Sequence, residues 1–133
     1  MNSLQKLFGT DSKKETEGVW VAYDDDVSFL IAAKGNKKAQ DVGKKLIQPY
    51  KRADGEVRVP ENMQDDILAE ISASAILLDW KGIKDDAGNP LPYSQPAAKA
   101  MLKALPHFAA FVDKCAGNIE LYRVQAEEAA RKN

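Results

Sequence analysis

The stretch LLDWKGIKDDAGNPLPYS, residues 77–94, constrains the fold more than any other part of this sequence. It separates two segments with helical spacing of apolar residues, and it is rich in Asp, Gly, Asn and Pro, which favour turns. It also contains large apolar side chains, among them Trp80, Ile83, Leu91 and Tyr93. We therefore predict a fixed connector whose apolar side chains pack onto the flanking helices, while Asp85 and Asp86 stay in water.

The chain before this connector has the pattern of a long helix. Pro60 suits the first helical turn, and the acids that follow it favour the positive end of the helix dipole. Gly82 is a suitable stop, which makes Leu77 to Trp80 the last turn of this helix. Apolar residues three and four positions apart form one stripe along it: Met63, Ile67, Ile71, Ala75 and Leu78.

Two more helices are predicted after the connector. Ser94 is placed to cap a helix that runs to about Ala104, and Pro106 starts a last helix of about six turns. Gly117 and Asn118 lower the helix propensity in the middle of that last helix and can kink it. Its apolar positions are Phe108, Phe111, Val112, Cys115, Ile119, Tyr122, Ala126 and Ala129. The C-terminal end, QAEEAARKN, has little apolar surface and can fray.

Residues 18–33, GVWVAYDDDVSFLIAA, predict a β-hairpin, because two runs with alternating side chains flank three acids. A lone hairpin is marginal in water, so one side should pack on helices. Asn36 can then cap a helix from Lys37 to about Tyr50, and RADGEV is a turn. Residues 1–17 lack a sustained period and are expected to form a flexible N-terminal arm.

Together these patterns predict a mainly α fold, in which residues 18–133 form one compact helical domain of about four helices with the hairpin packed on it. The 133 residues include 19 Lys plus Arg and 20 Asp plus Glu, so the net charge of −1 gives no general attraction to nucleic acid or to an anionic membrane. No signal-peptide pattern and no run of about 20 apolar residues occurs. Cys115 is alone and cannot form an internal disulfide. We expect a soluble cytoplasmic protein.

The reactive residue types do not fall into a catalytic or metal-binding pattern. The segment DDAGNPLPYSQP lacks the distal Glu of a calcium loop, and Asp24, Asp25 and Asp26 are better interpreted as a solvated turn than as an ion site. His107 and Cys115 are eight residues apart, too far to touch within one helix. No glycine-rich phosphate loop is present. The sequence therefore predicts no catalytic residue, no cofactor and no metal, and a protein that is not an enzyme.

The order of these segments resembles the tail assembly chaperones of long, non-contractile-tailed bacteriophages and their prophages. The resemblance covers residues 18–133. Its most specific part is Leu-x-x-Trp at Leu77 to Trp80, followed by Gly82, DDAGNPLPYS and a helix with AMLKALPHF. These are packing and turn signals, and they are not a catalytic signature.

The resemblance implies a mostly helical, non-enzymatic protein in the cytoplasm of the bacterial host. It implies binding to the tail tube protein and the tape measure protein during tail assembly, and absence from the finished virion. Self-association is a separate expectation, which comes from the apolar surface of the chain. The family often makes a second, longer product by ribosomal frameshifting. Two alternatives stay open: a permanent virion component, such as a head–tail connector or a tail terminator, and a small regulatory adaptor or nucleic-acid binder of the host.

A chaperone of this kind needs accessible apolar surface, and the predicted last helix offers apolar residues on two sides. We expect this helix, or the hairpin, to bind a partner or a second copy. The alternative is that both sides are buried within the monomer. The candidate partner-binding residues are Trp20, Phe111, Ile119, Leu121, Tyr122 and Val124.

Overall fold

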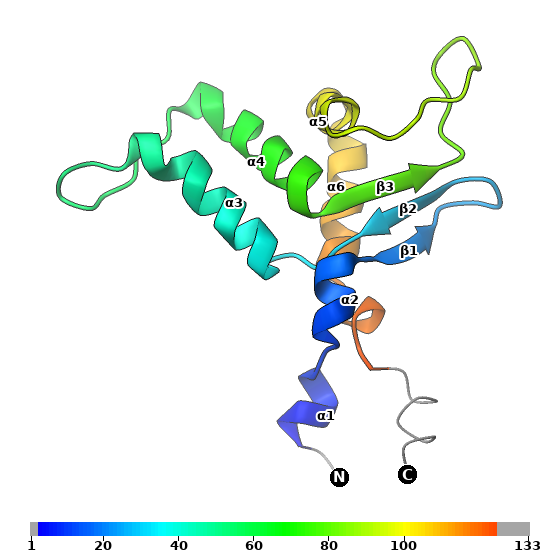
Figure 1. Ribbon diagram of the computed structural model, residues 1–133, viewed down its shortest axis with the longest axis horizontal. Coiled ribbons are helices and arrows are strands. Elements are labelled where there is room, and N and C mark those ends of the chain that lie inside the picture. The colour runs from blue at the N-terminus through cyan, green and yellow to red at the C-terminus, as the bar shows by residue number, and fades with distance from the viewer. Residues whose placement is uncertain (1–2, 125–133) are drawn as a thin grey trace.

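The computed structural model describes residues 3–124, which form a small antiparallel sheet packed against helices. The sheet has three strands in spatial order (Figure 1): β1 (Val19–Ala22), β2 (Ser28–Ile31) and β3 (Leu77–Lys81). One face of the sheet is covered by α6 (Pro106–Ala116). The ring of Phe29 on β2 packs against Phe108 and Phe111 of that helix, with ring centroids 5.3 and 5.7 Å away. This aromatic contact joins the sheet to the helices.

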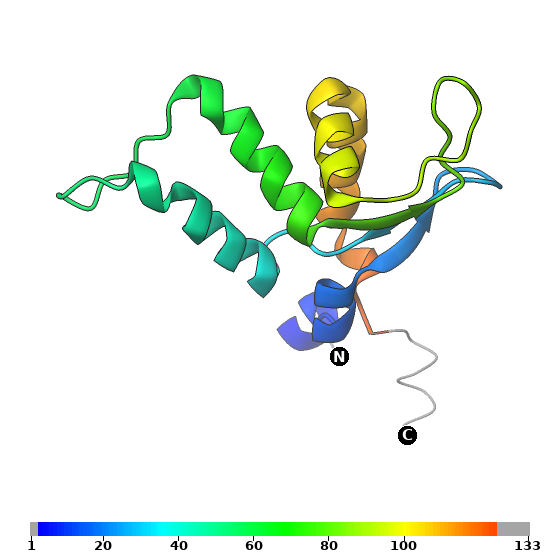
Figure 2. The same cartoon turned by 45° about the horizontal axis from the view of Figure 1, so that its top comes forward.

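Two antiparallel helices, α3 (Lys37–Ile47) and α4 (Glu61–Ala75), project from the sheet as an arm (Figure 1). A 3-10 turn, η1 (Gln48–Tyr50), ends the first of them, and the predicted turn closes the tip, where the backbone N–H of Arg52 donates to Glu56 O over 2.7 Å. The next helix, α5 (Gln95–Ala104), packs against α4 and stands beside it in Figure 2.

The helix starts predicted at Asn36, Ser94 and Pro106 are confirmed, because each depends on a local signal, a side-chain cap for the first two and a proline for the third. The side chain of Ser94 accepts from the N–H of Ala97, and Pro106 lies in the first turn of α6. Asn36 is 5% exposed and accepts from the N–H of Ala39 over 3.0 Å. Its amide also donates to Ala75 O over 3.0 Å, so one buried side chain ties the start of α3 to the end of α4.

The long helix predicted to reach Leu78 and stop at Gly82 ends at Ala75, and the segment that follows forms β3. The prediction was wrong because the apolar spacing around Leu77 and Trp80 suits a strand as well as a helix. The segment forms a strand because the outer backbone groups of β2 need a hydrogen-bond partner. The pairing begins where the N–H of Ala32 donates to the carbonyl of Ile76 over 2.8 Å.

The fold-class prediction is therefore confirmed in its coarser part. The described residues are rich in helix, and the hairpin forms within residues 18–33 as expected. The third strand was missed, so a hairpin packed on helices becomes a three-stranded sheet.

The last helix was predicted to run for about six turns, but α6 ends at Ala116. Gly117 caps it, and the side chain of Asn118 accepts from the N–H of Glu120 to start the 3-10 turn η2 (Ile119–Leu121). The two residues interpreted as a kink are thus a helix end, since Gly and Asn favour termination over continuation. The predicted fraying concerns residues 125–133, which lie outside the described residues.

Residues 1–17, expected as a flexible arm, contain two short helices: α1 (Leu4–Phe8) and α2 (Ser12–Glu17). Both are bonded to the other end of the described chain. The N–H of Asp11 donates to Tyr122 O over 2.7 Å, and the Arg123 guanidinium donates to Leu7 O over 2.6 Å. The segment therefore has local structure and fixed contacts that its sequence did not indicate to us.

The connector after β3 packs as predicted. The indole N–H of Trp80 donates to Leu91 O over 2.8 Å, and the hydroxyl of Tyr93 donates to Leu77 O over 2.6 Å. The two rings meet edge to face with centroids 5.2 Å apart. Both acids of the loop are exposed, and Asp85 accepts from two backbone N–H groups that follow it. The connector is a clasp that closes over the outer edge of β3.

The turn between β1 and β2 is the solvated turn predicted for the three acids. Asp24 accepts from the N–H groups of Asp26 and Val27, each over 2.8 Å, and all three acids are exposed. Gly82 approaches this turn so closely that a Cβ would clash with the carbonyl oxygen of Asp26, and its φ is +81°. Only glycine fits there, so the turn and the clasp are held close together.

Candidate partner-binding site

A groove of about 600 Å³ lies between α4 and α6. Both helices pack against α5, and their facing sides diverge beyond it. We call this the α4–α6 groove. Its lining comes from four elements: Lys34, Asp65, Leu68, Ala69, Ser72, Leu102, Lys103, Pro106, Ala109, Ala110 and Asp113.

The α4–α6 groove is apolar inside and has one prominent side chain on its wall. Leu68 is 63% exposed, although its neighbours Ile67 and Ala69 in the same helix are buried. The lining on α6 comes from Pro106, Ala109, Ala110 and Asp113, and the small side chains of Ala109 and Ala110 leave the space between the two helices unfilled. A second hollow of about 130 Å³ continues the groove as far as Val112 and Ala116.

The dimensions of the groove suit a short helix or a few apolar side chains. It follows α6 from Pro106 to Ala116, about 15 Å at the rise of an α-helix. Amphipathic helices of partner proteins bind in apolar grooves of this kind. A site of this kind can bind the apolar surface of another molecule.

Ion pairs stand at both ends of the groove. Lys34 and Asp113 approach to 3.1 Å at one end, and Lys103 and Asp66 to 2.8 Å at the other. The hydrogen bond from Lys103 lowers the pKa of the Asp66 carboxyl, with a second from Lys99. The Asp66 pairs join α4 to α5, the Lys34–Asp113 pair joins the segment before α3 to α6, and the apolar part of the groove lies between them.

The six predicted partner-binding residues are not gathered on one surface. Phe111 is half-buried, between Tyr23 of the hairpin and Phe29 of β2. Ile119 and Leu121 lie in η2 and are also half-buried. The two-sided helix that motivated this group does not form, because α6 ends before them. The involvement of these residues in partner binding stays a prediction.

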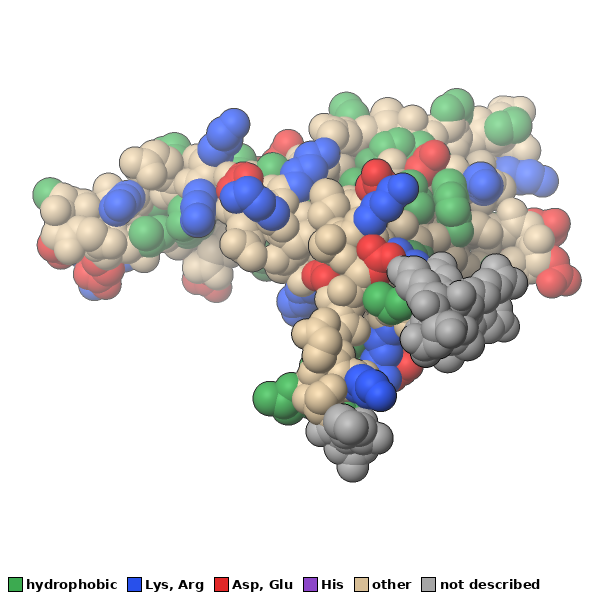
Figure 3. Space-filling model, turned by 60° about the horizontal axis from the view of Figure 1, so that its bottom comes forward, with side chains coloured by type: hydrophobic (Ala, Val, Ile, Leu, Met, Phe, Trp, Pro, Cys, Tyr) green, Lys and Arg blue, Asp and Glu red, His purple; other side chains and the backbone are tan. Residues whose placement is uncertain are grey.

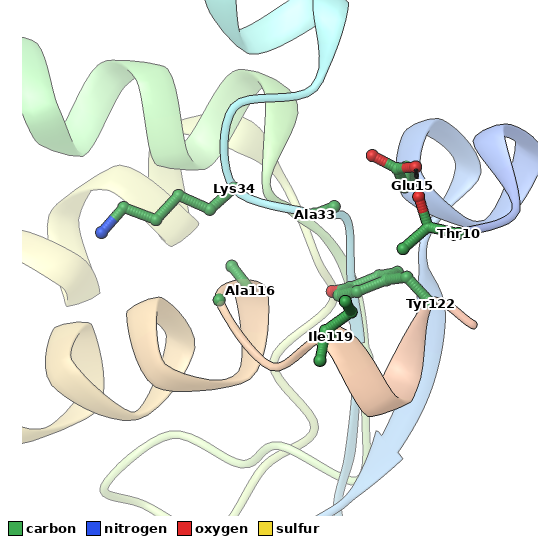
Figure 4. Close-up of a pocket in the computed structure, with 8 residues that line it drawn as sticks. Thr10, Glu15, Ala33, Lys34, Ala116, Ile119 and Tyr122 are labelled. Atoms are coloured by element: carbon green, nitrogen blue, oxygen red, sulfur yellow. Dashed lines mark hydrogen bonds between the residues drawn. The ribbon is translucent and has the colours of Figure 1, made fainter. Parts of the chain in front are cut away.

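Tyr122 lies in the interior of the monomer. It is 2% exposed, its hydroxyl donates to Ile31 O over 3.0 Å, and burial raises the pKa of its phenol to about 12. It lines a hollow of about 290 Å³ with Thr10 and Glu15, which are hydrogen-bonded to each other, and with Ile119 (Figure 4). This hollow lies where the two ends of the described chain meet.

Trp20 and Val124 keep the largest exposed surface among the predicted residues, 42% and 45%. The indole of Trp20 lies on β1, and the Lys81 ammonium lies 4.0 Å from its ring centroid. Around such apolar patches the surface carries both charge signs, and Lys and Arg side chains follow the arm (Figure 3). The molecule therefore offers separate apolar areas within a charged surface.

The reactive residue types singled out in the sequence lie apart from the groove lining. Cys115 is half-buried on α6, and burial raises the pKa of its thiol. His107 is exposed at the start of the same helix. Within residues 3–124 no cluster of three or more His, Cys, Asp or Glu side chains has the spacing of a metal site, and none of the helices is long and apolar enough to cross a membrane.

Sequence reasoning missed the α4–α6 groove. It results from the divergence of two helices that are distant in the chain, which no local pattern encodes. The available signals were the small residues Ala109 and Ala110 next to Phe108 and Phe111, and the apolar Leu68 beside the main stripe of α4. Leu68 lies next to the predicted stripe in the sequence, but the structure leaves it 63% exposed.

Comparison with known proteins gives one family. A family model described as YdaY prophage protein matches residues 34–133. No curated protein and no solved structure matches the chain.

Proposed function

The chain belongs to the family of YdaY prophage proteins, and on this premise we propose that it is a phage tail assembly chaperone. In this role it binds the tail tube protein and the tape measure protein in the cytoplasm of the host, and it leaves before the virion is complete. It acts through non-covalent binding and not through catalysis. Membership of a prophage family supports the phage context, and the segment pattern around the clasp supports the tail assembly role.

The observation that carries this proposal is the α4–α6 groove. An apolar groove with an exposed Leu68 on its wall is suited to cover an apolar segment of another protein. The small side chains of Ala109 and Ala110 allow ligands of different shape to enter. Ion pairs at both ends keep this surface bordered by charge, which helps to keep the free protein soluble.

Co-expression tests the proposal directly. The tagged full-length chain is produced together with the tail tube protein or the tape measure protein of the same prophage, and the recovered partner is quantified. We expect either partner to co-purify with the wild-type chain. Recovery of neither would overturn the proposed function.

Two substitutions then locate the binding site. Leu68→Ser removes the exposed wall of the groove, and Ala110→Trp fills it; each should reduce the recovered partner by about tenfold or more. Leu105→Ser is the matched control, because Leu105 is 49% exposed and lies outside the groove lining. Equal losses for all three variants, or no loss for the two groove variants, would exclude the groove as the binding site.

The protein composition of the virion distinguishes a chaperone from the alternative, a permanent virion component. Mass spectrometry of purified phage particles should find no copies of this chain, since a chaperone is released. Stoichiometric copies in the particle would instead assign it to a connector or a terminator.

A further inference from the structure

The outer edge of β1 has unpaired backbone groups. The backbone N–H of Tyr23 donates to Val27 O over 2.8 Å, and this hydrogen bond identifies which residues of β1 bond toward β2 and which point the other way. By that alternation Val21 bonds toward β2, and the N–H and C=O groups of Trp20 and Ala22 point away from the sheet. Within residues 3–124 these outward groups have no hydrogen-bond partner.

This edge also lacks most of the features that prevent strands from pairing between molecules. The strand Val-Trp-Val-Ala has no charge, no proline and no bulge against β2. Trp20 and Tyr23 are 42% and 67% exposed beside it. Among the described residues, the feature that limits such pairing is the length of the strand, four residues.

We propose that β1 pairs with β1 of a second copy, antiparallel and about a two-fold axis through Val21. In this register Trp20 lies opposite Ala22 of the partner, and the outward N–H and C=O groups of both residues bond across the junction. Four hydrogen bonds form by this symmetry, and the two sheets join into one.

The side chains favour this register over its neighbours. Residues opposite each other in an antiparallel pair share one face of the sheet, so the large indole of Trp20 covers the small side chain of Ala22 in the partner. On the other face Val21 meets its own symmetry mate. A shift of one residue along the strand would place Trp20 against Val21 and would misalign the outward bonding groups.

The size of the junction predicts a weak dimer. Stable protein interfaces bury about 1,200–2,000 Å² in total, and pairing through a four-residue strand falls short of that. The dimer therefore dissociates on dilution. The proposal is independent of the function proposed above, because the edge of β1 and the α4–α6 groove share no residue.

Sedimentation velocity over a range of concentrations tests the self-association. The full chain should show a reversible monomer–dimer equilibrium. Ala22→Pro removes one outward N–H from each copy while the bonds toward β2 remain, and it should weaken the dimer at least about tenfold. Leu68→Ser is the control, with unchanged dimerisation. A wild-type chain that stays monomeric at every concentration would overturn the proposal.

Disulfide trapping tests the register and does not depend on affinity. In a Cys115→Ala background, Val21→Cys places two thiols at the two-fold axis, within disulfide reach in a non-hydrogen-bonded pair. Ala22→Cys is the matched control: it is more exposed, but its symmetry mate lies two pairs away, too far for a disulfide. Oxidation should cross-link the Val21→Cys chain and leave the Ala22→Cys chain monomeric on a denaturing gel. Equal or reversed cross-linking would contradict this register.

Discussion

The two edges of the sheet differ in how their backbone groups are satisfied. At the β3 edge, the Tyr93 hydroxyl bonds Leu77 O, the Asp79 carboxylate accepts from the N–H of Trp80, and the clasp covers the strand. At the β1 edge, no described residue bonds the outward groups of Trp20 or Ala22. One edge is closed by the chain itself, and the other is available to another molecule.

This difference explains why two tryptophans in one small sheet have different roles. Trp80 is 6% exposed and holds the clasp through its indole N–H. Trp20 is 42% exposed, and the Lys81 ammonium lies 4.0 Å from its ring centroid. We infer that burial at the β3 edge maintains the fold, whereas exposure at the β1 edge serves association.

Replacing each tryptophan by alanine gives the largest expected contrast. Trp80→Ala should lower the free energy of unfolding by about 3–5 kcal/mol, since it leaves a cavity and frees the clasp. Trp20→Ala should lower it by about 1 kcal/mol and chiefly weaken the dimer. Urea denaturation measured at a concentration where the chain is monomeric compares the two. Similar losses would mean that the two edges do not differ in their contribution to folding.

Two Tyr→Phe variants test the same difference between the edges by removing a single oxygen atom. Tyr93→Phe removes the hydroxyl that bonds Leu77 O and should cost about 1–3 kcal/mol of stability, because a carbonyl near the core loses its partner. Tyr23→Phe at the β1 side should change stability by less than about 0.5 kcal/mol, as Tyr23 is 67% exposed. Thermal and urea denaturation of both variants check this. A larger loss of stability for Tyr23→Phe than for Tyr93→Phe would mean that the β1 edge, and not the β3 edge, maintains the fold.

Alkaline pH should open the closed edge. Burial, helped by the Asp79 charge, raises the pKa of the Tyr93 phenol above its usual value near 10. The folded chain then holds this proton where the unfolded chain has lost it. The contribution is present below about pH 10 and is lost as the pH rises through the folded pKa. In Tyr93→Phe the fall of stability above pH 10 should be shallower; Tyr122, with its raised pKa of about 12, keeps part of it. If stability falls with pH as steeply in Tyr93→Phe as in the wild-type chain, Tyr93 does not contribute to the loss of stability at alkaline pH.

The smallest expected effect concerns the contact that spans both edges. Lys81→Ala removes the ammonium above the Trp20 ring and should destabilise the monomer by about 0.5 kcal/mol. Lys84→Ala, at an exposed position of the clasp, is the matched control and should be neutral. A loss above about 2 kcal/mol for Lys81→Ala would show that the β1 edge contributes to folding more than its exposure indicates.

Local signals in the sequence predicted the parts of the fold that depend on them. Asn36 and Ser94 cap their helices because a cap needs only residues within one turn. The signals of α1 and α2 were also local: Ser3 and Asp11 cap these helices, and Gly9 and Gly18 follow them. We overlooked them because such short helices have little period to detect.

The remaining features depend on contacts between distant residues. Leu77 to Lys81 become a strand because β2 needs a partner, and that strand lies about 50 residues earlier in the chain. The groove exists because α4 and α6 diverge from a shared contact with α5. Neither follows from the pattern of its own segment, so apolar spacing alone could not have predicted them.

The contacts that join the two ends of the described chain have a consequence for its synthesis. The Tyr122 hydroxyl bonds a carbonyl 91 residues away, and Arg123 bonds one 116 residues away. On the ribosome, the N-terminal helices and β1 therefore emerge long before the residues that anchor them. The helices of the arm close through neighbouring residues and can form during that interval, whereas the contacts that hold the N-terminal helices form only after Tyr122 and Arg123 have emerged.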